Sequence, residues 1–303
     1  MPKFNPENVM LYEKTAGEIP SEYNKLVLEE VMQNSRVMQL AKYEEMKGKE
    51  KTFEYFAKGP GAYWVGEGEK IKTTKASMLQ VKMQAKKLGT IVVVSREYLN
   101  YKMSDFFTEM QSKIAEALYK KFDEAAILGV DNPFTQSIQS SVTTTGKIVK
   151  DAINYDSILE VGDLVLEEDI EPNAFISKTQ NRSALRGAIK TENGVALSLF
   201  DKTNNTIDGL PAVNLKSTEM KKGTLFTGDF DQMRYGIPFN IKYAISEEAQ
   251  LSTIENPDGS PVNLFEQELL AMRVTMDVGL MIIKDEAFAK LEAPAKSETP
   301  AGA

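Results

Sequence analysis

The chain has 303 residues, of which 42% are hydrophobic and 26% charged, enough to bury the core of one large domain or of two joined ones. It contains no cysteine and no histidine, which excludes disulfides, thiol and imidazole metal ligands, a cysteine nucleophile and a Ser-His-Asp triad. The formal net charge of −8 argues against tight binding of nucleic acid over the whole surface. No stretch approaches the roughly 18 apolar residues of a membrane span, so we expect no membrane association.

Residues 1–20 are polar and show no periodicity, which predicts an extended N-terminal arm. Ser21 is the candidate N-cap of a short helix, whose apolar stripe consists of Val27, Leu28, Val31 and Met32. From Val37 to Phe56 the pattern favours a strand, because Phe53 and Tyr55 alternate with polar residues.

Residues 57–77 form a polar, glycine-containing excursion between two strand patterns. The strand that follows has an apolar side made of Leu79, Val81, Met83 and Ala85, so the alternation predicts a long two-stranded ribbon. An isolated ribbon that is polar on one face is marginally stable in water unless it packs on something. We therefore expect the ribbon to find its partner on another subunit.

The region around this ribbon is basic, although the chain as a whole is acidic. Residues 41–90 contain 11 lysines and 6 glutamates, a local net charge of +5. This imbalance allows basic and acidic regions of different copies to attract each other. The alternative is a solvated, lysine-rich loop.

Trp64 is the only tryptophan, and it lies between Gly61 and Gly66 in the predicted excursion. No regular element of its own chain is placed to shield it there, and aromatic side chains anchor interfaces disproportionately. We therefore predict that Tyr63, Trp64 and Val65 bury against an adjacent subunit.

The chemical motifs are weak. The spacing of Gly61 and Gly66 is that of a phosphate loop, but Glu67 stands where a lysine is needed and would repel a phosphate. The acidic run at residues 167–171 does not converge as metal ligands, and residues 256–259 indicate a turn. No feature selects a carboxylate pair for hydrolysis. We therefore expect no catalytic residue, no metal and no cofactor.

Residues 88–94 form a continuous apolar run, which favours a strand buried on both faces. A short turn at residues 96–100 follows, capped by Ser95. From Ser104 an amphipathic helix of about 37 Å is predicted, ending at Gly129, with its apolar positions at Phe107, Met110, Ile114, Leu118, Phe122, Ala125 and Leu128.

The stretch from Val130 to about Ser246 indicates a mixed helix and strand subdomain. Its features are a Ser/Thr-rich stretch at 137–145, helices at 155–166 and 179–189, strands at 174–177, 210–215 and 224–227, and turns at 193–194 and 208–209.

Residues 270–282 alternate with strand period for thirteen positions, far beyond the usual strand of about 5–6 residues. This pattern predicts a long strand in an extended sheet that returns the chain to the long helix. Arg273 and Asp277 project from the same face of it, as part of either an ordinary exposed face or a subunit contact.

Taken in order, these segments resemble the major capsid proteins of tailed bacteriophages. The resemblance covers roughly residues 5–291 and is strongest for siphophages of Gram-positive hosts, staphylococcal ones included. It rests on Gly61 to Gly68 (GAYWVGEG), the lysine-flanked strand to Leu88, Val94 to Leu99 (VSREYL), the helix ending at Gly129, and the later segments 173–177, 208–213, 228–230, 263–267 and 287–291.

The resemblance implies an α+β fold of the Hong Kong 97 type. It also implies that Lys70, Lys72 and Lys75 are interface charges rather than crosslinking groups, and we predict that Glu67 is a further interface residue. The implied divisions are an N-terminal arm (1–20), the start of the P-domain (21–49), the extended E-loop hairpin (50–90), the P-domain with its spine helix (91–130), most of the axial A-domain (131–250), the P-domain return strand (251–291) and a disordered tail (292–303).

The implied function is structural and not enzymatic: a coat protein that forms hexamers and pentamers of an icosahedral virion head around double-stranded DNA, assembled in the host bacterial cytoplasm. The implied partners are other copies, a separate scaffolding protein, a portal protein and packaged DNA in non-specific contact. Two alternatives stay open. One is an encapsulin-like nanocompartment shell of the same fold, and the other is a carboxylate-based hydrolase.

Overall fold

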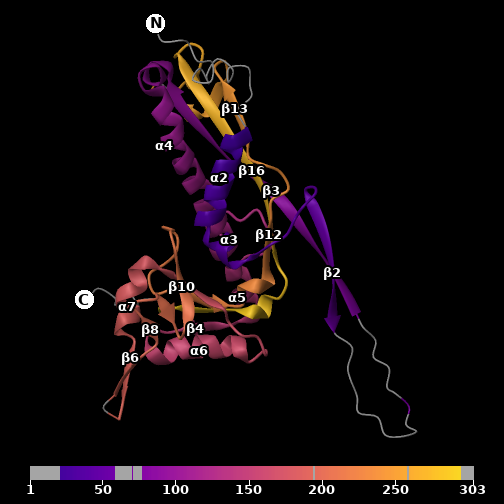
Figure 1. Ribbon diagram of the computed structural model, residues 1–303, viewed down its shortest axis with the longest axis vertical. Helices are drawn as coiled ribbons and strands as arrows, with labels where there is room; N and C mark the ends of the chain where they lie inside the picture. Colours follow the sequence, from indigo (N-terminus) through magenta and orange to yellow (C-terminus); the bar gives the residue numbers. More distant parts are fainter. Residues whose placement is uncertain (1–20, 59–69, 71–76, 194, 258, 295–303) are drawn as a thin grey trace, which may run out of the picture.

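The computed structural model describes residues 21–58, 70, 77–193, 195–257 and 259–294. The described residues form a six-stranded and a seven-stranded sheet, besides two hairpins. In Figure 1 the first sheet lies beside a long helix, the second lies with shorter helices in the lower part of the molecule, and a ribbon projects away from both. The predicted mixture of helix and sheet is confirmed.

The first sheet is built around two long antiparallel strands, β3 (Ser77–Ser95) and β16 (Leu269–Ile282). Their register runs from Leu269 opposite Ser95 to Gly279 opposite Ala85. The predicted return strand and the apolar strand after it are therefore one continuous strand. The other members of this sheet are β1 (Lys42–Tyr43), β12 (Met233–Gly236), β2 (Glu50–Lys58) and β13 (Lys242–Ser246).

Three helices pack on one face of this sheet. Helix α4 (Arg96–Asp123) lies along β3 and β16, α2 (Ser21–Asn34) packs beside α4, and α3 (Arg36–Leu40) follows α2. The apolar stripe predicted for the first helix is confirmed, because Val27 and Val31 are buried.

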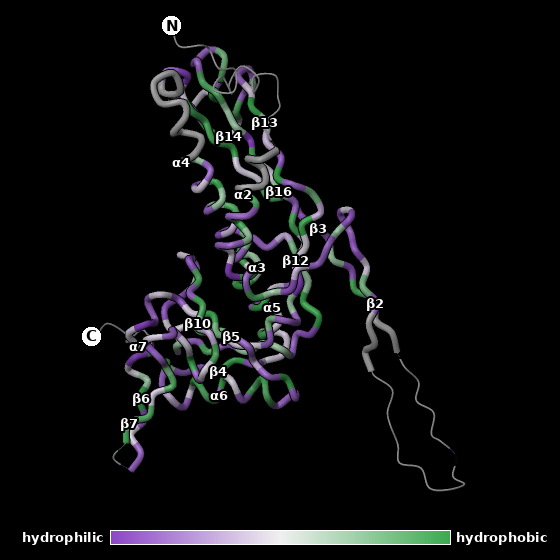
Figure 2. The backbone as a smooth tube through the Cα atoms, in the orientation of Figure 1, coloured by the Kyte–Doolittle hydropathy of each residue, from purple (hydrophilic) through white to green (hydrophobic). Residues whose placement is uncertain are grey.

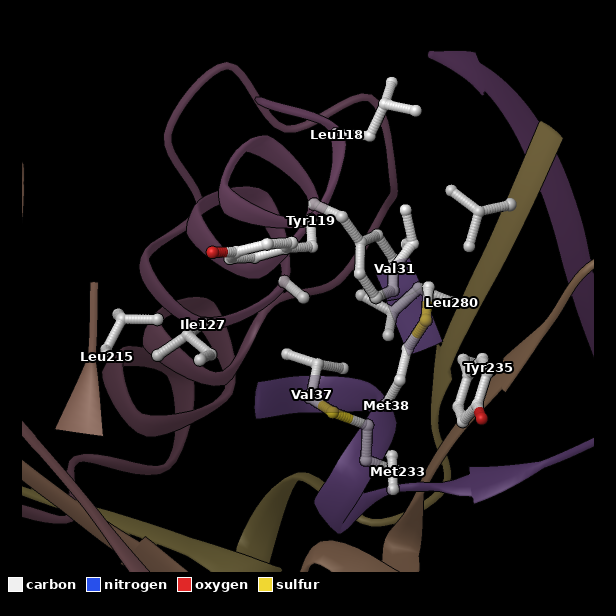
Figure 3. Close-up of a cluster of buried hydrophobic side chains, with 14 of the residues drawn as sticks. Val31, Val37, Met38, Leu118, Tyr119, Ile127, Leu215, Met233, Tyr235 and Leu280 are labelled. Carbon is white, nitrogen blue, oxygen red and sulfur yellow. The ribbon is translucent and has the colours of Figure 1, made fainter. Parts of the chain in front are cut away.

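Figure 3 shows where these helices meet the strands: side chains from α2, α3 and α4 converge with side chains from β12 and β16. Burial of each large apolar side chain contributes about 1.5–3 kcal/mol, so this cluster is the main source of stability on this side of the molecule. Alternate residues of β16 face it, namely Met272, Val274, Met276, Val278, Leu280 and Ile282.

Helix α4 is longer than the sequence pattern indicated. It begins at Arg96, directly after β3, so the predicted turn at residues 96–100 and the predicted start at Ser104 are wrong. The backbone N–H of Arg96 donates to the carbonyl of Glu268 at 3.0 Å, so the start of the helix is held by a residue far away in sequence.

The end of the long helix is as predicted. Its last turn, Glu124–Leu128, is π-helical, and Gly129 follows with a φ of 71°. A Cβ atom at Gly129 would lie 2.9 Å from the Oγ of Ser137. Both the backbone conformation and the close approach therefore require glycine here.

The strand pattern predicted from Val37 is wrong at its start, because residues 36–40 form α3. Asp123, buried at the end of α4, accepts hydrogen bonds from the Ser35 hydroxyl (2.6 Å) and from the N–H groups of Arg36 (2.8 Å) and Val37 (3.2 Å). A carboxylate from a distant helix thus satisfies the first N–H groups of α3. No periodicity within five residues can reveal such a partner.

The second sheet has the strand order β4-β17-β11-β5-β10-β9-β8. β10 is parallel to β5, while β11 is antiparallel to both β5 and β17. The strands are β4 (Ile148–Lys150), β17 (Phe288–Glu292), β11 (Leu225–Gly228), β5 (Ala174–Lys178), β10 (Leu210–Leu215), β9 (Thr206–Ile207) and β8 (Phe200–Asp201).

The helices of this region are only partly as predicted. α6 (Tyr155–Leu166) is confirmed, but the helix predicted at 179–189 is split into η3 (Thr179–Asn181) and α7 (Arg182–Gly187). The Ser/Thr-rich stretch forms a helix, α5 (Ile138–Thr145), which begins with a capping box in which Ser137 and Ser140 bond to each other's backbone N–H.

The chain crosses between the two sheets twice in its last third. After η4 (Phe230–Gln232), β12 and β13 pair with β16 in the first sheet; after η5 (Asp285–Ala287), β17 returns to the second. The division predicted at residue 250 therefore does not coincide with a change of sheet. β17 also extends one residue into the predicted tail, and residues 295–303 lie outside the described residues.

Two hairpins complete the fold. β6 (Ile189–Glu192) and β7 (Val195–Ser198) form an exposed hairpin below the second sheet (Figure 2), around the turn predicted at 193–194. β14 (Gln250–Glu255) and β15 (Pro261–Asn263) form the other, around the turn predicted at 256–259, and it packs against Ala271 of β16.

Candidate assembly interface

The projecting ribbon is made of β2 and residues 77–84 of β3 (Figure 1). The register places Glu50 opposite Gln84, at the base, and Phe56 opposite Met78, toward the far end. From Ala85 onward β3 pairs with β16 instead. One uninterrupted strand therefore leaves the body of the molecule and forms one edge of the ribbon.

Side chains alternate between the two faces of the ribbon, as predicted. Phe53 lies opposite Val81 on one face, and both are half-buried. The other face is exposed and polar, and carries the cross-strand hydrogen bonds from Gln80 to Glu54 (2.6 Å) and from Gln84 to Glu50 (3.2 Å). The ribbon thus has one solvent-exposed polar face and one partly covered face.

Most of the residues predicted to touch a neighbouring subunit come from the excursion between β2 and β3. Lys70 is described and exposed. The others lie outside the described residues, and these are Tyr63, Trp64, Val65, Glu67, Lys72 and Lys75.

Arg273 and Asp277 lie on the face of β16 that is turned away from the helices, but they differ in exposure. Arg273 is exposed and lies opposite Ile91, which is itself 46% exposed. Asp277 is only 9% exposed and lies opposite Lys87. Asp277 therefore has little surface to offer to a neighbour, whereas Arg273 has much.

The exposure of Ile91 corrects the expectation that residues 88–94 are buried on both faces. The β14–β15 hairpin covers this face only at the end where Val93 lies, and packs Leu251 and Val262 there. Between the hairpin and the buried Asp277 the face is uncovered. We call the uncovered part the outer strip; its residues are Lys87, Gly89, Ile91, Lys242, Arg273 and Thr275.

Negative charge gathers next to the outer strip, at the end of the sheet where α4 begins. Phe265 projects there with 74% of its surface exposed, beside the buried Leu264. Aromatic side chains are enriched at the cores of protein interfaces. We call this region the acidic end; its exposed carboxylates are Glu97, Glu248, Glu255, Glu266 and Glu268. Local pattern did not identify it, because its members come from three segments.

The described residues hold no cluster of three metal-ligating side chains. Among the carboxylates that the structure describes, Asp123 has the most strongly shifted pKa: burial raises it to about 6, opposed by the hydrogen bonds from Ser35, Arg36 and Val37. Through these hydrogen bonds Asp123 caps the N-terminus of α3, which makes it a structural group. None of the helices in the described ranges combines the length and apolar character of a membrane span.

Comparison with known proteins identifies the family. The model of the phage capsid family matches residues 17–293. The chain is 52% identical over 297 residues to the major capsid protein of Staphylococcus phage 80alpha, covering 98% of this chain and 91% of that protein. It is 29% identical to the probable major capsid protein gp17 of Mycobacterium phage D29, over 91% of this chain and 90% of that one.

Solved structures agree on the fold. A chain from Microbacterium phage Oxtober96 superposes with a TM-score of 0.72 at 20% identity, covering 86% of this chain and 91% of that one. The capsid of an empty GTA particle, computed with C5 symmetry, gives a TM-score of 0.64 at 14% identity over 86% and 90% of the two chains. With the family match extending over nearly the whole sequence, the chain belongs to the phage capsid family and is a major capsid protein of a phage.

Proposed function

We propose that this chain assembles as hexamers and pentamers into an icosahedral head that encloses double-stranded DNA, and that the ribbon of each copy lies over a neighbouring copy. The observation that carries the proposal is the pairing of β2: of the described strands, only β3 pairs with it. A two-stranded ribbon has too little of its own surface to bury and is stabilised by docking.

The outer strip is the proposed docking face for the tip of the ribbon. It combines one exposed apolar side chain, Ile91, with the cations Lys87, Lys242 and Arg273. The tip segment offers the complementary chemistry, because Tyr63, Trp64 and Val65 are followed by Glu67. Apolar contact supplies the affinity and the opposite charges fix the direction of approach.

The acidic end is the proposed partner of the ribbon lysines. Lys70, Lys72 and Lys75 follow the aromatic segment in the sequence, and the acidic end lies at the end of the first sheet where α4 begins. Each such contact between exposed charges is weak, but it repeats at every subunit of a closed shell.

The remaining partners follow from the same role. A scaffolding protein directs assembly in the host bacterial cytoplasm, a portal protein occupies one vertex, and the packaged DNA makes non-specific contact. The net charge of −8 is consistent with weak contact to DNA, since tight binding requires an excess of Lys and Arg.

The test is deletion of the ribbon tip. Residues 59–76 are replaced by Asn-Gly, which joins the ends of β2 and β3 with a tight turn. The variant is expected to be soluble, with an unchanged circular dichroism spectrum and melting temperature, but to form no shells in electron microscopy when expressed with its neighbouring phage genes. Intact shells from the variant would overturn the role of the ribbon.

The single tryptophan gives a second readout. If Trp64 buries against another copy, its fluorescence emission shifts to the blue when subunits assemble. The Arg273→Glu variant serves as the control in which docking is impaired, because it keeps Trp64 but removes a cation from the outer strip. Emission that does not change on assembly would contradict docking of the tip.

A further inference from the structure

The base of the ribbon holds two contacts that join it to the body of the molecule. The first is an ion bridge through Glu44, in the segment between β1 and β2. Its Oε2 lies 3.0 Å from the Nζ of Lys51 in the ribbon, and its Oε1 pairs with the guanidinium of Arg234 in β12. One carboxylate therefore connects a ribbon strand to the strand that lies two positions from β3 in the sheet.

All three members of this bridge are partly shielded from water. The side chains of Glu44, Lys51 and Arg234 are 21%, 32% and 29% exposed. Lys51 also donates to the carbonyl of Glu45 at 2.8 Å and lies 4.9 Å from the centre of the Phe53 ring. Partial burial and the shared carboxylate make this pair stronger than an isolated surface ion pair.

The second contact is a cluster of three methionines, Met46, Met83 and Met281, which are at most 3% exposed. They come from the segment before β2, from the ribbon part of β3 and from β16. Phe53 and Val81 of the ribbon pack against them. Methionine is unbranched, with three rotatable bonds, so such a cluster can repack without leaving a cavity.

Two glycines make room for this cluster. Gly236 of β12 and Gly279 of β16 are paired. A Cβ on Gly236 would lie 2.7 Å from the Cγ of Met46, and one on Gly279 would lie 3.1 Å from the Cγ of Met83. Met46 and Met83 thus pack directly on the backbone at these two glycines, where any side chain would displace them.

The cluster lies at the point where β3 changes partner. Gln84 is the last residue of β3 that pairs with β2, and Ala85 is opposite Gly279 of β16. The N–H of Ala85 donates to the carbonyl of Lys49, at 2.8 Å, just before β2 begins. The β2–β3 ladder of the ribbon and the β3–β16 ladder of the body therefore meet at Ala85.

We propose that Glu44 is a positioning residue that sets the angle of the ribbon relative to the body, and that the cluster of Met46, Met83 and Met281 is the adaptable contact about which the ribbon turns. This inference rests on the proposed function, because the angle matters when copies dock in non-equivalent positions of a shell. The ion bridge stabilises one angle of the ribbon, and repacking of the methionines lets the ribbon adopt other angles.

The test uses the absence of cysteine from the chain. Cysteines are introduced at Glu54, on the exposed face of the ribbon, and at Lys113, on α4, where the side chain is 72% exposed. Spin labels at these positions report the distance between ribbon and body by pulsed electron paramagnetic resonance. Labelled full-length subunits are measured dispersed in solution and after co-assembly with an excess of unlabelled subunits.

The Lys51→Met variant keeps the Glu44–Arg234 pair but removes the connection to the ribbon. It is expected to widen the distance distribution of dispersed subunits by about twofold, as the ribbon samples more angles. Lys51→Arg is expected to retain the narrow distribution. Lys42→Met is the matched control, because it removes an ion pair between β1 and Asp231 of η4 without touching the ribbon.

The methionine cluster is tested in the opposite direction. Met83→Leu keeps the volume but removes rotational freedom, so the distribution is expected to narrow relative to the wild type. Melting temperatures are measured for every variant, since a merely structural role would lower them without changing the distribution.

Unchanged distributions in Lys51→Met and Met83→Leu, or equal broadening in Lys42→Met, would overturn the inference. The proposed function fails separately, if wild-type subunits form no shells. In shells that do form, Lys51→Met is expected to give a wider range of particle diameters in electron micrographs, and a single wild-type diameter would count against the inference.

Discussion

The two parts of β3 lie in different surroundings although they belong to one strand. Residues 85–95 pair with β16 and lie against α4 on one face, whereas residues 77–84 pair with β2 alone and leave a polar face in water. Apolar burial contributes to stability in proportion to its area. The body part of β3 therefore holds the fold together, and the ribbon part is available for contact with other copies.

The largest expected effect is a loss of stability in the body of the molecule. Phe122 is 2% exposed and packs edge-to-face on Phe134, with ring centres 6.1 Å apart. Phe122→Ala leaves a cavity under α4 and is expected to lower the free energy of unfolding by about 3–5 kcal/mol, measured by urea denaturation. A loss no larger than that of a ribbon variant would contradict the assignment of stability to the body.

The next effect depends on pH. Asp123 is buried, with a pKa raised from 3.8 to about 6. It therefore binds a proton at a higher pH in the folded state than in the unfolded chain. Its contribution to stability is therefore fully present below about pH 4 and is lost as the pH rises through 6.

Asp123→Asn removes this titration and supplies the reference. The unfolding free energy of the wild type minus that of Asp123→Asn is expected to fall by about 2 kcal/mol between pH 4 and pH 7, since each unit of pKa shift corresponds to about 1.4 kcal/mol and the carboxyl group of the unfolded chain is already partly ionised at pH 4. A difference that stays constant, or that rises with pH, would show that the carboxyl group is not desolvated as the structure indicates.

A smaller effect is expected on the ribbon side. Phe53 is half-buried against the methionine cluster, so Phe53→Ala is expected to lower the unfolding free energy by about 1 kcal/mol. Urea denaturation of Phe53→Ala and Phe122→Ala side by side compares the loss of unfolding free energy in the ribbon with that in the body. Equal losses would erase the distinction between them.

The substitution with the smallest expected effect on stability, Arg273→Glu, is expected to have a large effect on assembly. Arg273 is exposed, so Arg273→Glu is expected to change the unfolding free energy by less than about 0.5 kcal/mol while it reverses a charge of the outer strip and prevents shell formation. Lys202→Glu, an exposed charge reversal in the turn between β8 and β9, is the control. Sedimentation analysis of both variants would refute the outer strip as an interface if both assemble normally.

The candidate interface was only partly predictable. The ribbon follows from alternation in its two strands, and Arg273 from its place on a long strand. Ile91 lies in an apolar run that indicated burial, and its exposure depends on how far the β14–β15 hairpin reaches. Phe265 and the carboxylates around it come from segments that only the folded chain brings together.

Long periodic elements were determined by the sequence itself. The stripe of α2, the last turns of α4 with Gly129, the ribbon strands and β16 repeat a pattern often enough for their buried face to be evident, since one face of each must leave water. Resemblance to a known family added the arrangement of these elements.

Only the tertiary structure decided the elements that depend on distant partners. Asp123, from another helix, accepts hydrogen bonds from the first N–H groups of α3 in addition to the local cap by Ser35. Glu268 accepts a hydrogen bond from the first N–H of α4, and β17 joins the second sheet between β4 and β11. The burial of Asp277 beside the exposed Arg273 is of the same kind. Each of these features is set by hydrogen bonds or by coverage from residues far away in sequence, and local pattern carries no information about such partners.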